Sequence, residues 1–109
     1  MDFVSNTTAE GAIRLALEGD LTIYHADEIR QRLIDIIQGE SRLDLDLSQV
    51  MDIDSAGLQV LLLAKREALA TGKEMRIVAH SPAVQELLDF LNVAAYFGDP
   101  LVIPAGENA

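Results

Sequence analysis

The strongest constraint on the fold is a strand-like segment followed closely by a helix-like one in the middle of the chain. Leucines alternate with aspartates over residues 43–47, which is the period of a strand with one buried face. After a short acidic loop, apolar residues recur at helical spacing over 56–70, and Thr71-Gly72 end the predicted helix. Four leucines are expected to form its principal buried stripe, with Val60 and Leu63 off it: Leu58, Leu61, Leu62 and Leu69.

Strand and helix patterns also alternate along the rest of the chain. Further strands are predicted over 12–17, 75–79 and 100–104, with a short extended piece over 21–24. One further helix has Asp27 in its first turn, the apolar face Ile29, Leu33, Ile36 and Ile37, and a stop at Gly39; another begins at Ser81-Pro82. Tyr96 and Phe97 are expected to cover the core. The pattern predicts a small α/β domain, one sheet with helices packed on it.

Length and composition exclude several classes of protein. The 109 residues, half of them apolar, suffice for one domain with one core. A net charge of −10 with scattered Lys and Arg argues against nucleic acid and anionic membranes, and favours a protein partner with a positive surface. No apolar run approaches the roughly 20 residues of a spanning helix, and no secretory signal is evident. Together with the absence of cysteine, this predicts a cytoplasmic protein without disulfides.

Residues that could support catalysis are sparse. His25 and His80, the only histidines, lack partners at a spacing typical of a metal site or a catalytic triad. Four aspartates could be imagined holding Mg²⁺ in a phosphoryl-transfer site: Asp44, Asp46, Asp52 and Asp54. The alternation with leucines already explains Asp44 and Asp46 as the outward face of a strand. There is no glycine-rich phosphate loop and no Gly-x-Ser-x-Gly elbow, so we expect neither an enzyme nor a cofactor.

Ser55, at the predicted start of the central helix, has two interpretations. Asp54 or Ser55 could cap the helix, a role worth about 1 kcal/mol. Alternatively, the Ser55 hydroxyl is exposed and accepts a phosphate, which would meet the free N–H groups of the helix. That phosphate would add about −1.5 to −2 charges beside Asp52 and Asp54, and so alter a docking surface without altering the fold.

The segments around Ser55 resemble the signature of STAS domains, the anti-sigma factor antagonist (anti-anti-sigma factor) family. Three segments carry the central motif: Asp46-Leu47-Ser48, Val50 and Ile53-Asp54-Ser55-Ala56-Gly57-Leu58. The likeness continues at Glu18-Gly19-Asp20-Leu21 and from Ser81-Pro82-Ala83-Val84 through Leu91. The resemblance implies a single STAS domain over 1–109, with a small mixed β-sheet backed by about four helices.

The resemblance also implies a function, which is non-enzymatic partner switching in bacterial signal transduction. The unphosphorylated protein would bind an anti-sigma factor that is also a serine kinase, and phosphorylation of Ser55 would release it. A PP2C-type phosphatase would reset the switch. The kinase would bring ATP and Mg²⁺, so this chain needs no cofactor, and we expect a monomer or a weak homodimer. The partner-binding residues expected from the family fold are Thr22, Tyr24, Asp52, Asp54, Ala56, Gly57 and Leu58.

Two departures from the family pattern keep an alternative open. Many antagonists carry a second serine where this chain has Ala56, and sporulation-type antagonists have an aspartate where it has Thr22. Relatives with a threonine there occur, by resemblance, in chemotaxis and other signalling settings, and a related branch docks on the ATPase of lipid-transport ABC complexes. The alternative is therefore a constitutive adaptor in such a complex, in which Ser55 only caps the helix.

Overall fold

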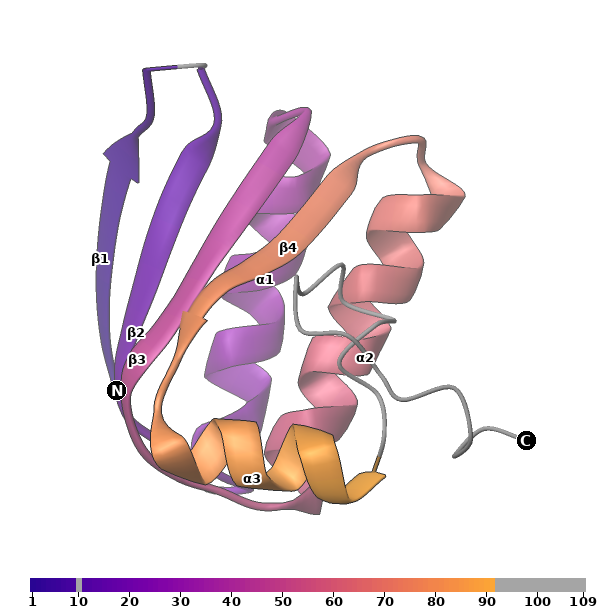
Figure 1. Ribbon diagram of the computed structural model, residues 1–109. Helices are drawn as coiled ribbons and strands as arrows, with labels where there is room; N and C mark the ends of the chain where they lie inside the picture. Colours follow the sequence, from indigo (N-terminus) through magenta and orange to yellow (C-terminus); the bar gives the residue numbers. More distant parts are fainter. Residues whose placement is uncertain (10, 92–109) are drawn as a thin grey trace.

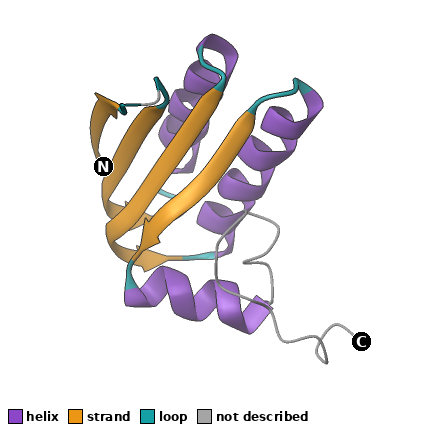
Figure 2. Cartoon of the chain, turned by 45° about the horizontal axis from the view of Figure 1, so that its top comes forward, coloured by secondary structure: helices purple, strands orange, loops and turns teal. Residues whose placement is uncertain are grey.

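The computed structural model describes residues 1–9 and 11–91, which form a four-stranded sheet with two helices packed on one face (Figure 1). The elements follow in the order β1 (Asp2–Thr7), β2 (Ile13–Leu21), α1 (Ala26–Gly39), β3 (Arg42–Ile53), α2 (Ser55–Ala70), β4 (Glu74–His80) and α3 (Pro82–Leu91). Helices α1 and α2 cover the same face of the sheet, while α3 lies across one end of it (Figure 2).

The sheet is mixed, as predicted, and its topology gathers three helix starts at one end. Its strand order is β1-β2-β3-β4; β1 pairs antiparallel with β2, and the two remaining pairs are parallel. The carboxyl ends of parallel strands lie at the same edge of a sheet, and ligands of open α/β sheets bind outside that edge. We call this region, where β2, β3 and β4 finish and α1, α2 and α3 begin, the carboxyl end of the sheet.

The core lies between the sheet and the two covering helices. Alternate residues of β2 and β3 point into it, and α1 contributes Ile29, Leu33 and Ile37, spaced four residues apart on one face as predicted. The largest fully buried side chains are Leu15, Leu17, Leu21, Ile29, Leu33, Ile37, Leu43, Leu45, Leu47, Leu61 and Met75. Burying a side chain of this size is worth about 1.5–3 kcal/mol, so these residues supply most of the driving force for folding.

The sequence-based boundaries were wrong in several places. Strand β1 was missed because it lies at the edge of the sheet, where it pairs only with β2 and is almost entirely exposed. Its sequence therefore shows no clear alternation of apolar residues. The extended piece over 21–24 is instead a turn after Leu21. The described residues contain three helices rather than about four. The predicted strand over 100–104 and the covering residues Tyr96 and Phe97 lie outside the described residues.

The predicted acidic loop after Leu47 is the second half of β3. This half extends beyond the end of β4 and continues to pair with β2, where Gly19 lies opposite Val50 and Leu21 opposite Ile53. Register shifts in the β2–β3 ladder break the period of two, so that Val50, three residues after Leu47, is again buried. A strict alternation rule therefore ends the strand too early.

Helix α2 buries a different stripe from the one predicted. Leu58 and Leu61 are buried as expected, but the stripe continues through Ala64 and Ala68, and Leu69 is exposed. Val60, expected off the stripe, is buried because α2 packs against α1 as well as against the sheet. Small alanines allow the helix to approach its neighbours closely, which the leucine pattern alone does not indicate.

The opposite face of the sheet carries ion pairs. The carboxylate of Asp44 lies on this outward face, as predicted, between Arg42 (3.2 Å) and Arg76 (3.6 Å), and is buried there. Asp46 pairs with Arg14 at 3.1 Å. Partial burial acts to raise the pKa of Asp46, but hydrogen bonds from Ser48 and the Arg14 pair together outweigh it and lower that pKa. These aspartates have structural partners on this face.

A lysine from outside α1 donates hydrogen bonds to backbone carbonyls at the end of that helix. The last turn of α1 has no basic residue of its own, and Lys73, just before β4, donates from Nζ to the carbonyl oxygens of Ile37 (2.7 Å) and Gln38 (3.2 Å). The ammonium group thereby meets two of the carbonyls that a helix leaves unpaired, at the negative end of its dipole.

We predict that Lys73→Met lowers the free energy of unfolding by about 1–2 kcal/mol, because it removes charge-assisted hydrogen bonds and leaves the α1 carbonyls to solvent. The measurement is urea denaturation followed by circular dichroism. Arg66→Met, which removes an exposed cation from α2, is the matched control and should change stability by less than about 0.5 kcal/mol. Equal losses in both variants would contradict the capping role.

Candidate functional site

Asp54 connects three segments at the carboxyl end of the sheet. Its Oδ1 accepts a hydrogen bond from the Gly57 amide (2.9 Å), which makes Asp54 the N-cap of α2. Its Oδ2 accepts one from the Ile23 amide (3.1 Å) in the turn before α1, and its own amide donates to the Leu21 carbonyl (3.3 Å). One side chain therefore fixes the turn at 21–23 against the start of α2.

The same hydrogen bonds act on the charge of Asp54. The amide of Gly57, followed by that of Ile23, stabilises the ionised carboxylate and lowers the pKa of Asp54 below its ordinary value of 3.8. Asp54 is therefore a charged cap at neutral pH.

Gly57 is required by the close approach of α2 to β2. A Cβ at this position would overlap the backbone carbonyl of Leu21, whose chain cannot move without disturbing the sheet. The Asp-Ser-x-Gly segment thus has a physical explanation at both ends: Asp54 caps the helix and holds the neighbouring turn, and Gly57 lets the helix start lie against the end of β2.

Ser55 lies between these two residues and has neither task. It is the first residue of α2 and is exposed, and no hydrogen bond of its hydroxyl to another described residue is found. The interpretation in which Ser55 caps the helix is wrong, because the extended backbone belongs to Asp54 (φ −118°, ψ −176°), and it is the Asp54 side chain that faces the free amides. The Ser55 hydroxyl therefore lies in solvent at the positive end of the α2 dipole.

The structure brings most of the predicted partner-binding residues to this end. Tyr24, in the turn before α1, has 90% of its surface exposed, and Asp52 at the end of β3 is exposed. Thr22 and Ala56 are partly exposed beside them. Two of the predicted residues lie below the surface, and their effect on a partner would be through the shape of the site: Gly57 and Leu58.

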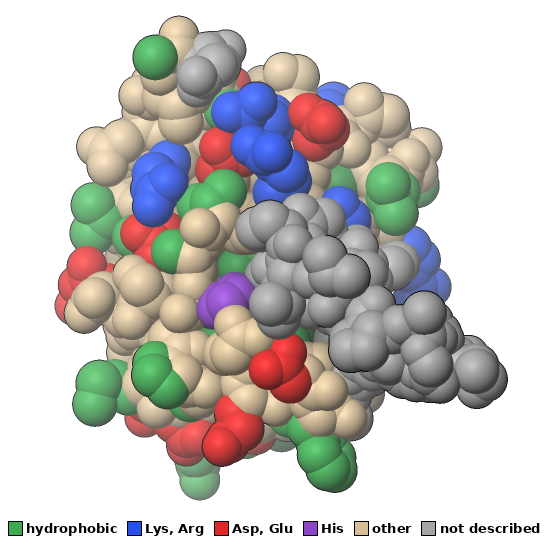
Figure 3. All heavy atoms as spheres, viewed as in Figure 1, with side chains coloured by type: hydrophobic (Ala, Val, Ile, Leu, Met, Phe, Trp, Pro, Cys, Tyr) green, Lys and Arg blue, Asp and Glu red, His purple; other side chains and the backbone are tan. Residues whose placement is uncertain are grey.

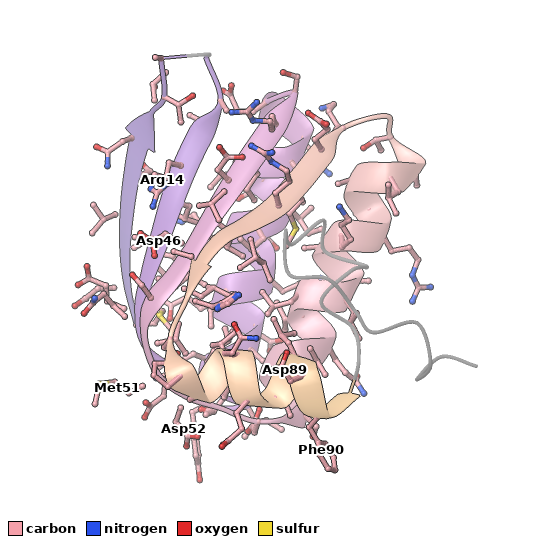
Figure 4. All side chains as sticks on the ribbon, in the orientation of Figure 1. Arg14, Asp46, Met51, Asp52, Asp89 and Phe90 are labelled. Atoms are coloured by element: carbon pink, nitrogen blue, oxygen red, sulfur yellow. The ribbon has the colours of Figure 1, made fainter. Side chains whose placement is uncertain are left out.

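Sequence reasoning missed three exposed apolar residues at the same end. Ile23 (66% exposed), Met51 (78%) and Phe90 (83%) come from the turn before α1, from β3 and from α3. In Figure 4, Met51, Asp52 and Phe90 point away from the body of the molecule at the end where α3 lies. A helical wheel of α3 would have indicated Phe90, since the buried pair Val84 and Leu88 defines the opposite side of that helix.

Charge is distributed unevenly between the two ends of the molecule. Lys and Arg side chains gather over the upper part of the face in Figure 3, whereas acidic and hydrophobic side chains alternate along the lower edge. Many acidic residues lie in the elements that meet at the carboxyl end, namely the ends of β2 and β3, the starts of α1 and α2, and α3: Asp20, Asp27, Glu28, Asp52, Asp54, Glu86 and Asp89. This end is therefore suited to a partner surface that combines positive charge with apolar side chains.

The described residues provide no assembled metal site. Within 1–9 and 11–91, no group of three or more His, Cys, Asp or Glu side chains is close enough to share an ion. The four aspartates considered as Mg²⁺ ligands are divided between the outer face of the sheet and its carboxyl end. No described helix has the length and apolar character to cross a bilayer.

The fold and the site define a small α/β domain that presents an exposed serine at a helix start. The chain belongs to the family of STAS domains: the family model described as "Mlab, STAS domain" matches residues 4–103. The predicted STAS resemblance and fold class are confirmed.

Several solved structures share this fold. An anti-sigma factor antagonist from Mycobacterium paratuberculosis is 20% identical, with a TM-score of 0.77, over 93% of this chain and 86% of that one. A putative anti-sigma factor antagonist from Thermotoga maritima is 22% identical, with a TM-score of 0.76, over 85% and 80% of the two chains. The Bacillus cell fate determinant SpoIIAA in its phosphorylated form is 19% identical, with a TM-score of 0.68, over 98% of both. At these identities the similarity establishes the fold.

We predict that Gly57→Ala destabilises the protein by about 3 kcal/mol or prevents folding, because overpacking against an immobile backbone costs at least 1–3 kcal/mol. Urea denaturation measures the change. Gly39→Ala is the matched control, since a Cβ on Gly39 meets nothing within 4 Å, and it should be neutral or slightly stabilising. A Gly57→Ala protein as stable as the control would disprove the close approach of α2 to Leu21.

We predict that the stabilising effect of the Asp54 charge is lost in acid. A carboxyl whose folded-state pKa is depressed stabilises the fold above its unfolded-state value and loses that contribution as the pH falls through the folded-state pKa. The direction of the Asp54 shift therefore places the loss below about pH 4. Wild type should exceed Asp54→Asn in urea midpoint at pH 7, and the difference should shrink progressively as the pH falls below about 4. A difference independent of pH would show that the charge is not what stabilises the cap.

Proposed function

We propose that this protein is a non-enzymatic signalling adaptor that acts by partner switching, with Ser55 as the phosphorylated residue. One observation carries the proposal: the Ser55 hydroxyl is exposed at the first position of α2, while Asp54 performs the capping and Gly57 the close packing. A modified Ser55 would therefore remove no contact on which the fold depends.

Phosphorylation at this position would change the surface and leave the core intact. A kinase would transfer the γ-phosphoryl group of its ATP to Ser55 Oγ, with the hydroxyl proton passing to a base of the kinase and ADP leaving. The dianion would lie at the α2 N-terminus, where unpaired amides and the helix dipole favour negative charge. It would also lie at the carboxyl end of the sheet, which exposes the apolar side chains of Tyr24 and Met51 and which a partner would have to cover.

The partner that best fits is an anti-sigma factor that is also a serine kinase, with a PP2C-type phosphatase restoring the unmodified form. Solved STAS structures of the same fold include the antagonist SpoIIAA in unphosphorylated and phosphorylated forms, which supports a fold that accommodates both states. Under this proposal the protein acts in the bacterial cytoplasm, and its binding state controls transcription through a released sigma factor.

A second candidate function is constitutive docking, in a chemotaxis or lipid-transport ABC complex. The matching family model is described as "Mlab, STAS domain", words that mention neither a sigma factor nor phosphorylation, and the apolar residues at the carboxyl end are exposed in the unmodified protein. In this alternative Ser55→Ala binds and functions normally, and protein from its native host carries no phosphate in an intact-mass measurement.

We predict that Ser55→Asp weakens binding to the cognate partner by about tenfold or more, since a charge that loses its water in an interface without gaining a partner costs more than about 1.4 kcal/mol. Titration calorimetry measures the affinity, and the far-UV circular dichroism should remain that of wild type. Ser41→Asp is the matched control, because Ser41 is exposed at the other end of β3. Equal affinities for wild type and Ser55→Asp, with no phosphate on the native protein, would reject the switch and favour constitutive docking.

A further inference from the structure

We propose that the docking surface continues from Ser55 across the end of β3 to a groove beside α3, and that this groove receives a large apolar side chain flanked by Lys or Arg on the partner protein. This proposal rests on the adaptor function proposed above and names the chemistry of the partner. Neither the central motif around Ser55 nor the predicted partner-binding residues include α3, although the family resemblance extends over that helix.

The groove lies between the end of β3 and the exposed side of α3. It encloses a volume of about 380 Å³ and is lined by Asp52, Ile53, Ala83, Glu86, Leu87 and Phe90. Ile53 and Leu87 are partly buried and pack against the core, so they form a fixed apolar floor. Phe90, near the end of α3, is one wall of the groove and leaves 83% of its own surface in solvent.

Exposure of these apolar groups is costly unless something covers them. Phe90 and Met51 together expose two large apolar side chains within one end of a small domain, although neither contributes to the core. Exposed apolar side chains next to a groove, with polar groups around them, are typical of protein interaction sites, and buried aromatic anchors dominate the energy of such interfaces.

The acidic residues around the groove favour a positively charged partner. Two of the six lining residues, Asp52 and Glu86, are exposed acids, Asp89 follows on the same helix, and none of the six is basic. The chain as a whole has a net charge of −10, so a second copy would meet repulsion at this end. A partner with Lys or Arg beside its apolar residue would be attracted instead.

A second groove, between α1 and α2, provides an internal comparison. It is lined mainly by apolar residues of α2, including Val60 and Leu63, but its polar rim carries the cations Arg30 and Arg66. The two grooves thus offer similar apolar contacts with opposite charge. A basic probe should therefore distinguish them.

The probe is a synthetic amphipathic peptide with a leucine and phenylalanine stripe flanked by lysines, titrated into the ¹⁵N-labelled full chain. We expect amide shifts at Asp52 and along 83–90, with little change in the α1–α2 groove. Phe90→Ser and Glu86→Lys should each weaken binding by about tenfold, the effect of losing an anchor or of reversing a charge at the contact. The matched controls Leu69→Ser and Glu74→Lys, exposed residues away from this groove, should bind like wild type.

Several outcomes would overturn the proposal. They include shifts confined to the α1–α2 groove, equal binding by Phe90→Ser and wild type, and equal binding by a peptide with the same lysines but no apolar stripe. If sedimentation shows that the wild-type chain self-associates and that Phe90→Ser abolishes this, the occupant is a second copy and the proposal is also wrong. Phe90 is so exposed that its replacement should preserve the fold, and Glu86→Lys tests the same groove independently.

The switch and the groove can fail separately. Ser55→Asp should leave the basic peptide bound as tightly as before, or more tightly, because the added negative charge attracts lysines, whereas it should weaken the whole partner. If the switch proposal is wrong, Ser55→Asp will bind the whole partner as tightly as wild type does. If the groove proposal is wrong, Phe90→Ser will bind the peptide as tightly as wild type does.

Discussion

The hydrogen bonds of Asp54 are the interaction on which the rest of the site depends. A single carboxylate accepts from the Gly57 amide of α2 and from the Ile23 amide of the preceding turn, so two segments far apart in sequence are held in one geometry. These bonds favour the ionised form, which is also the form that the α2 dipole prefers. Because one residue satisfies both segments, the turn that carries Tyr24 and the helix start that carries Ser55 form one surface.

Different residues at the start of α2 stabilise the fold and face the solvent. Asp54 caps, Gly57 allows the helix to approach Leu21, and Ser55 in the first turn is left exposed, with no hydrogen bond from its hydroxyl to another described residue. In an ordinary helix start the serine would be the cap, and modifying it would remove a stabilising hydrogen bond. Here the cap and the candidate acceptor are different residues, which is the physical condition for a modification that alters docking without unfolding the domain.

The sequence predicted the α/β class and the position of Ser55 at a helix start from strong local patterns, whereas the mixed sheet was predicted from the family resemblance. It did not predict the length of β3, because the pairing between β2 and β3 changes register. Beyond Leu47, buried residues therefore no longer alternate with exposed ones. It missed β1, whose exposed edge position requires no apolar face. The exposed Met51 and Phe90 were also missed: each is an ordinary apolar residue in its own element, and only the topology brings them to the same end. Local periodicity finds a core, whereas a docking surface assembled from three elements needs the fold.

The location of the added charge explains how a chain that is already strongly acidic could still respond to phosphorylation. Most acidic side chains at the carboxyl end are exposed and separated by solvent, so their mutual repulsion is screened within about 8–10 Å at physiological salt. A dianion on Ser55 would instead lie on the surface that the proposed partner covers, where a docked partner excludes water and screening is weak. The free protein would tolerate the charge because helix amides and solvent both stabilise it, while the complex would lose the solvent contribution. Phosphorylation of Ser55 would therefore destabilise the complex much more than it destabilises the fold.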